Sequence, residues 1–106
     1  MSKRQPHAAL VQEVLYRLRA AGWFAVPIQQ QARCVKGRYF RGGLYPGIAD
    51  VLAWREGNYV RSLAVECKHG SDKLKPDQLR FKRDFEAHGG NFVECRIPED
   101  DLEDWL

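Results

Sequence analysis

Two carboxylates and a lysine in the middle of the chain have the types and the spacing that metal-assisted hydrolysis requires. Asp50 ends the run Pro46-Gly-Ile-Ala-Asp50, and Glu66 and Lys68 stand in the run Ala64-Val-Glu66-Cys-Lys68. Residues two apart on a strand point to the same side, so Glu66 and Lys68 are predicted to project from one face. Both follow an apolar stretch, where a buried charge is costly unless it is paired or binds a metal.

The same residues predict a chemical role for each group. If a neighbouring strand brings Asp50 beside Glu66, the two carboxylates and the backbone carbonyl of Cys67 offer the hard oxygen ligands that Mg²⁺ prefers. A water on that ion can become a nucleophile, and Lys68 can orient it or stabilise charge on a phosphate. The alternative is a salt-bridged strand end, which is the commoner explanation for an isolated Glu-x-Lys. The Gly-x-x-Asp run upstream favours the metal site.

Glu13 is a candidate third acid, carried by a predicted N-terminal helix. That helix is predicted from Pro6 to the residues before Gly22, with apolar residues at helical spacing from Leu10 onward. Glu13 falls at the edge of this apolar stripe, where its carboxylate can lean over the rim of a sheet. Periodicity alone favours a second interpretation, a surface ion pair with Arg17 one turn later.

Gln78 is a further candidate, in a second predicted helix that Pro76 opens. Phe81 and Phe85 define the buried face of this helix, and Gln78 lies on the same face one turn earlier. A buried amide must find hydrogen-bond partners, and a catalytic water, a metal-bound water or a phosphate would serve. The alternative is a glutamine that bonds free backbone groups at the start of the helix.

These residues must be positioned by helices and strands, which the sequence predicts in the order α-β-β-β-α-β-α. After the first helix come a strand over 23–28, a loop over 33–47, and two strands over 48–54 and 59–68 joined by a hairpin turn. A loop over 69–75, the helix from Pro76 to Gly89-Gly90, a strand over 91–97 and a short helix over 98–106 follow. The predicted fold class is α/β, a mixed central β-sheet flanked by helices in one domain covering residues 1–106.

Composition and charge narrow the setting of such a domain. No apolar run approaches the length of a membrane span, and the start of the chain lacks the apolar core of a signal peptide. Cys34, Cys67 and Cys95 are far apart, which argues against a zinc ribbon or a disulfide framework and suits a reducing cytoplasm. Residues 98–106 carry five acids and no base, whereas the other 97 residues hold 17 bases against 9 acids. A body with this excess of bases attracts polyanions such as nucleic acid; the alternative is a solvated, slightly basic surface.

Basic and aromatic residues between 33 and 47 are predicted to form a loop that contacts DNA. The cations would neutralise phosphates and the rings would stack on bases; the alternative is a solvated loop with its aromatic rings in the core. Two lysines that flank the candidate site are expected to touch phosphates as well. His7, His69 and His88 lack the spacing of a metal-binding set, and His69, although near the site in sequence, is interpreted as a surface residue. The predicted DNA contacts are Arg33, Lys36, Arg38, Tyr39, Arg41, Lys73 and Lys75.

Taken together, these motifs resemble the VRR-NUC domain, a branch of the PD-(D/E)xK nuclease superfamily. The resemblance covers nearly the whole chain and is carried by Pro46-Gly-Ile-Ala-Asp50, Glu66-Cys-Lys68, Leu74-Lys75-Pro76-Asp77-Gln78 and the Gly89-Gly90 before the last strand. It implies a restriction-endonuclease-like fold. The positions that match the family imply metal ligands at Asp50 and Glu66, a catalytic lysine at Lys68, a conserved site residue at Gln78 and an additional acid at Glu13.

The sequence therefore predicts a DNA endonuclease that depends on Mg²⁺ or Mn²⁺. Small stand-alone members of the family are similar in fold to archaeal Holliday-junction resolvases, which implies a homodimer selective for junction or flap DNA in the cytoplasm of a bacterial or phage-infected cell. Apolar residues left over after the core is built are candidates for the dimer interface, among them Trp23, Leu102, Trp105 and Leu106; the alternative for some of them is that they complete the fold. The alternatives are a restriction-type nuclease and a non-cleaving DNA-binding or assembly module of the same fold.

Overall fold

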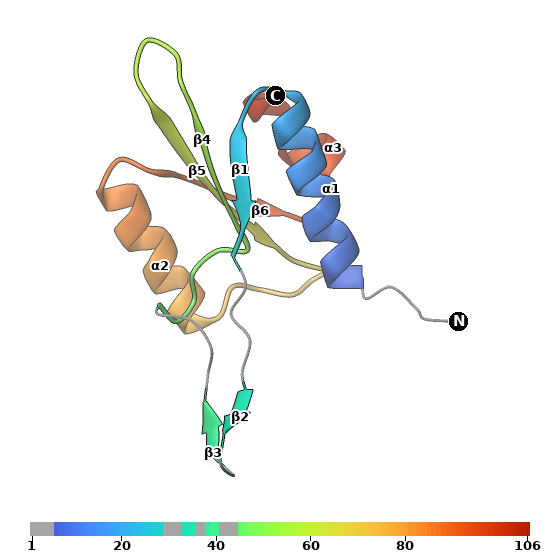
Figure 1. Cartoon of the computed structure of the whole chain (residues 1–106), viewed down its shortest axis with the longest axis vertical. Helices are drawn as coiled ribbons and strands as arrows, with labels where there is room; N and C mark the ends of the chain where they lie inside the picture. The colour runs from blue at the N-terminus through green and yellow to red at the C-terminus, as the bar shows by residue number, and fades with distance from the viewer. Residues whose placement is uncertain (1–5, 29–32, 36–37, 41–44) are drawn as a thin grey trace.

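The structure is a computed structural model that describes residues 6–28, 33–35, 38–40 and 45–106 (Figure 1). These residues form both helices and strands in a mixed α/β arrangement. The elements are α1 (Pro6–Ala20), β1 (Phe24–Pro27), β2 (Arg33–Val35), β3 (Arg38–Phe40), β4 (Val51–Arg55), β5 (Arg61–Cys67), α2 (Pro76–Ala87), β6 (Asn91–Cys95), α3 (Pro98–Asp101) and the 3-10 turn η1 (Glu103–Trp105).

The main sheet has four strands in the order β1-β4-β5-β6. The pairs β1–β4 and β4–β5 are antiparallel, and β5–β6 is parallel. A parallel pair needs a crossover connection, and α2 provides it between β5 and β6. The prediction of a mixed sheet flanked by helices is therefore confirmed. Pro27 lies on the edge strand β1, where a residue without an N–H is tolerated.

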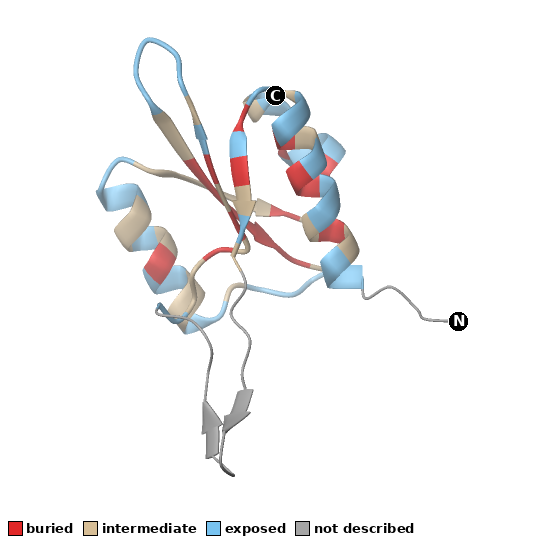
Figure 2. Cartoon of the chain, in the orientation of Figure 1, coloured by how far each residue is buried: buried red, intermediate tan, exposed pale blue. Residues whose placement is uncertain are grey.

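Helices cover both faces of this sheet (Figures 1 and 2). On one face, the apolar stripe of α1, which includes Leu10, Val14 and Leu18, packs against alternate strand residues and forms the larger core cluster. On the other face, Phe81 of α2 is buried against Ala64 of β5 in a smaller cluster. Because side chains alternate along a strand, neighbouring residues of β5 serve the two cores in turn.

Residues 33–47, predicted as a loop, contain two short strands. β2 and β3 pair antiparallel in a separate two-stranded sheet, with Arg33 opposite Phe40 and Val35 opposite Arg38. The loop prediction was wrong here because it weighed the glycines and arginines of the segment. The β-branched and aromatic residues between them favour strands.

The C-terminal segment completes the core, which corrects part of the predicted dimer interface. Leu102 is fully buried and Trp23 is 3% exposed, so neither side chain is free to contact a second chain. The indole N–H of Trp23 donates to the backbone carbonyl of Trp105 at 2.7 Å, tying the start of β1 to the chain end. The helix predicted over 98–106 is divided into α3 and η1. Across the described residues, no helix has the length and apolar character needed to cross a membrane.

Candidate functional site

Glu66 and Lys68 lie where β5 ends, and both are buried. Glu66 is the second-last residue of β5, and Lys68 is the first residue after the strand. Their exposed fractions are 3% and 8%. The Lys68 Nζ atom lies 4.0 Å from Glu66 Oε1, on the same side of the strand, as the sequence predicted. The backbone N–H of Lys68 donates to the carbonyl of Cys95 at 3.0 Å, so the neighbouring strand β6 fixes the backbone here.

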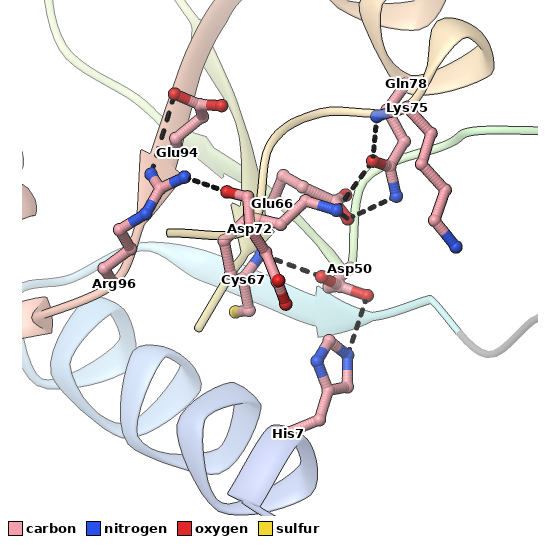
Figure 3. Close-up of polar contacts among 10 residues, drawn as sticks. His7, Asp50, Glu66, Cys67, Asp72, Lys75, Gln78, Glu94 and Arg96 are labelled. Atoms are coloured by element: carbon pink, nitrogen blue, oxygen red, sulfur yellow. Dashed lines mark hydrogen bonds and ion pairs between the residues drawn. The ribbon is translucent and has the colours of Figure 1, made fainter. Parts of the chain in front are cut away.

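Asp50 is brought to the same place by the residues that lead into β4. Its Oδ2 atom accepts a hydrogen bond from the Cys67 N–H at 2.8 Å, and its Oδ1 atom lies 3.2 Å from His7 Nε2 (Figure 3). The chain reaches this position through Gly47, whose φ of +83° favours glycine. A Cβ atom at Gly47 would lie 2.3 Å from the backbone carbonyl of Asp77, so the start of α2 packs directly on this glycine.

Gln78, in the first turn of α2, joins the charged residues of the site. Its Oε1 atom accepts hydrogen bonds from Lys68 Nζ at 2.7 Å and from the Lys75 N–H at 2.8 Å, and its Nε2 atom donates to Glu66 Oε1 at 3.0 Å (Figure 3). The interpretation of Gln78 as a glutamine that bonds free backbone at the helix start is therefore confirmed. The amide bonds free backbone at the helix start and also reaches the carboxylate and the lysine.

The electrostatics of Glu66 are those of a site that favours positive charge. Burial, and after it the nearby Asp50, raise the pKa of Glu66 to about 8, although Lys68 acts in the opposite direction. Within the described part of the chain, no N–H or hydroxyl group donates to the buried Oε2 atom of Glu66, whereas Oε1 is bonded to Gln78. The neighbouring Asp50 carboxyl also raises the pKa of Glu66 through a side-chain hydrogen bond. A cation at Oε2 would satisfy this oxygen and stabilise the ionised carboxylate.

These donors fit a hard divalent cation. Glu66 Oε2, the Asp50 carboxylate and the carbonyl of Cys67 between the two strand-end residues could hold Mg²⁺ or Mn²⁺, which retain several waters and need few protein ligands. Among the described residues, no three of the histidines, cysteines, aspartates and glutamates are grouped to hold a metal ion. The protein would therefore supply two carboxylates and one backbone carbonyl, and water would supply the remaining ligands.

The site opens into a cleft of about 460 Å³. Three residues that the sequence interpretation left out of the site line it: His7, His69 and Asp72. The ring centroids of His7 and His69 are 5.9 Å apart. His7 is exposed, whereas His69 is half-buried with its Nε2 atom covered, so the interpretation of His69 as a surface residue was wrong. The cleft is lined by His7, Asp50, Glu66, Cys67, Lys68, His69, Asp72, Lys73, Lys75 and Gln78.

Glu13 does not belong to this cleft. Its Oε2 atom accepts a hydrogen bond from Arg17 Nε at 3.0 Å on the exposed side of α1, which is the ion pair that periodicity favoured. His7, from the first turn of the same helix, reaches Asp50 instead. The sequence held one signal for this position. Pro6 predicts the start of the helix, so His7, which follows it, is placed at the end of α1.

The predicted DNA contacts divide into two groups. Lys73 and Lys75 are exposed and line the cleft, as expected for residues that flank the site. The other five come from the segment over 33–41. Lys36 and Arg41 lie outside the described residues, and Arg33, Arg38 and Tyr39 belong to β2 and β3, of which the structure describes only the backbone.

Comparison with known proteins gave no match. No family model fits the chain, and neither a curated protein nor a solved structure is significantly similar to it. What the chain does must therefore be inferred from its own site.

Proposed function

We propose that the chain is a DNA endonuclease that depends on Mg²⁺ or Mn²⁺, with a PD-(D/E)xK-type core. The observation that carries the proposal is the buried Glu66 carboxylate. One of its oxygens is bonded to Gln78, and the other receives no N–H or hydroxyl hydrogen bond within the described residues, beside Asp50 and Lys68. A buried ion pair with a purely structural role is expected to satisfy both oxygens.

Each side chain would have a distinct task. Asp50, Glu66 and the carbonyl of Cys67 would hold the ion, which when bound supplies an activated water and a counter-charge for the phosphate. The Cys67 N–H and His7 orient the Asp50 carboxylate. Lys68 presents its ammonium group beside Glu66 and would stabilise negative charge on the reacting phosphate oxygens.

Gln78 is a positioning residue in this scheme. It accepts from Lys68 and donates to Glu66, so one amide sets the distance between the catalytic lysine and a metal ligand. Its own place is fixed because Lys75, the residue before the helix, donates its backbone N–H to the same oxygen. Catalytic groups held in this way need little reorganisation during reaction.

The substrate follows from charge. Lys73 and Lys75 stand at the cleft, and the chain outside residues 98–106 has an excess of bases, which suits a polyanionic substrate. We propose DNA with a junction or a flap as the preferred form, cut by a homodimer that brings two sites to symmetric strands.

A cleavage assay with matched variants tests the proposal. Labelled four-way junction, flap and linear duplex DNA would be incubated with the protein and Mg²⁺, Mn²⁺ or excess EDTA. Cleavage is expected with either ion and not with EDTA, and Glu66→Gln should abolish it. Arg83→Ala is the control, because Arg83 lies on exposed α2 surface away from the cleft. Undiminished cleavage in excess EDTA would overturn the proposal, and binding without cleavage would favour a non-cleaving module.

A further inference from the structure

Arg96, directly after β6, contacts the turn that forms one wall of the cleft. Its Nε atom donates to the carbonyl of Gly70 at 3.0 Å. Its Nη2 atom donates to the carbonyl of Asp72 (Figure 3). Its Nη1 atom lies 3.7 Å from a carboxylate oxygen of Glu94. A single guanidinium group therefore joins the last strand to two carbonyls of the turn, using the fixed fork of donors that distinguishes arginine from lysine.

Arg96 is itself held in place by the core. The Asp101 carboxylate accepts the backbone N–H of Arg96 at 2.7 Å and that of Ile97 at 2.9 Å. Asp101 ends α3, and the next residue, Leu102, is fully buried in the larger core cluster. The backbone from which the Arg96 side chain extends is thus fixed by a residue next to the core.

The clamped turn lies between two points where hydrogen bonds fix the segment that joins β5 to α2. At one end, the Lys68 N–H is bonded to Cys95, and at the other, the Lys75 N–H is bonded to Gln78. Between these two points, Gly70 has a φ of +53°, and the turn carries Asp72 and Lys73 into the lining of the cleft.

We propose that Arg96 is a positioning residue for substrate binding: it clamps the turn so that Lys73 faces the cleft and meets a backbone phosphate of the substrate. The inference rests on the proposed nuclease function. Arg96 does not line the cleft, so it acts through the turn. Lys68 and Glu66 are held by Gln78 instead, so loss of the clamp weakens binding and leaves the chemical step intact.

The test compares Arg96→Ala with Arg96→Lys and the control Arg83→Ala in steady-state cleavage of labelled DNA. Arg96→Ala is expected to raise KM about tenfold or more, the scale of losing one charge-assisted contact, with kcat within about twofold. Arg96→Lys, which can reach one carbonyl, should fall between wild type and Arg96→Ala. Adding Lys73→Ala to Arg96→Ala should raise KM little further, because both changes remove the same contact. A wild-type KM in Arg96→Ala, or a loss confined to kcat, overturns the inference.

A second measurement separates this inference from the proposed function. Hydrogen exchange at the Asp72 amide, which donates to the carbonyl of His69 at 3.0 Å, reports the order of the turn without any cleavage. Faster exchange there in Arg96→Lys than in Arg83→Ala supports the clamp, and equal exchange overturns it. If wild type fails to cut DNA while exchange rises, the proposed function fails and the clamp stands as a structural contact only, so the substrate-binding role is withdrawn.

Discussion

Replacing Glu66 with glutamine should stabilise the metal-free protein at alkaline pH. The folded protein raises the pKa of Glu66 from 4.5 to about 8 through burial and the neighbouring Asp50. At pH values below 4.5 the carboxyl is protonated in both the folded and the unfolded chain, so its contribution to stability is fully present. As pH rises toward about 8, the unfolded chain ionises first, and the free energy of unfolding falls.

The size of this loss follows from the two pKa values. A tenfold change in proton affinity is worth about 1.4 kcal/mol, so the separation between 4.5 and about 8 corresponds to roughly 3–5 kcal/mol. Glu66 is almost fully buried, so solvent screens this cost little. Glutamine has the same shape and can still accept the hydrogen bond from Gln78, but it has no charge to bury.

Urea unfolding in EDTA between pH 5 and pH 9 measures the effect. The stability of Glu66→Gln relative to wild type should increase by roughly 3–5 kcal/mol across this range. Glu13→Gln is the matched control, because Glu13 is exposed and pairs with Arg17, and its difference from wild type should stay nearly constant. At pH 9, Mg²⁺ or Mn²⁺ should raise the free energy of unfolding of wild type by about 2.7 kcal/mol when the ion is at a hundred times its Kd. The same ion should not stabilise Glu66→Gln. A Glu66→Gln difference that does not change with pH would refute the reasoning.

Three further predictions address chemistry, backbone and assembly. Lys68→Ala should lower the cleavage rate at least about a hundredfold, while DNA affinity in Ca²⁺ stays close to wild type; a wild-type rate would return Lys68 to a structural ion pair. Gly47→Ala should destabilise the fold by about 1–3 kcal/mol in thermal unfolding, since its Cβ would meet the Asp77 carbonyl; an unchanged melting temperature would contradict this close approach. Sedimentation should show a species of twice the 12.2-kDa chain, and a monomer with and without junction DNA would argue against symmetric two-strand cutting.

Strong local patterns were sufficient to predict the main sheet and its helices. β4 and β5 were predicted from apolar runs on either side of a hairpin turn, and α2 from the proline that opens it and the glycines that close it. The β2–β3 pair was not predicted, because each strand has three residues and the charged residues of the segment obscure the pattern. Short strands are decided by pairing, which a local pattern does not contain.

The candidate site was predictable where one element sets the geometry. Glu66 and Lys68 share a face because they are two apart at a strand end, and Gln78 faces the sheet because Phe81 does. The prediction of Glu13 as a site residue was wrong because a helical wheel gives the direction of a side chain around the helix axis and not its position along that axis. His7 and Glu13 are six residues apart, about 9 Å along α1, and the end of the helix that carries His7 is the one beside Asp50.

The two oxygens of Glu66 give the strongest reason to prefer a functional site over a salt-bridged strand end. In a structural pair, the short contact of the lysine would go to the carboxylate. Here Lys68 Nζ is 2.7 Å from the neutral oxygen of Gln78 and 4.0 Å from Glu66, so the ammonium charge is left largely uncompensated beside the cleft. The carboxylate is likewise bonded through one oxygen to a neutral amide, and its second oxygen receives no N–H or hydroxyl hydrogen bond among the described residues. Burying this carboxyl beside a lysine without a close ion pair costs stability, and a cation that holds the carboxylate ionised, together with a phosphate at the lysine, would offset that cost.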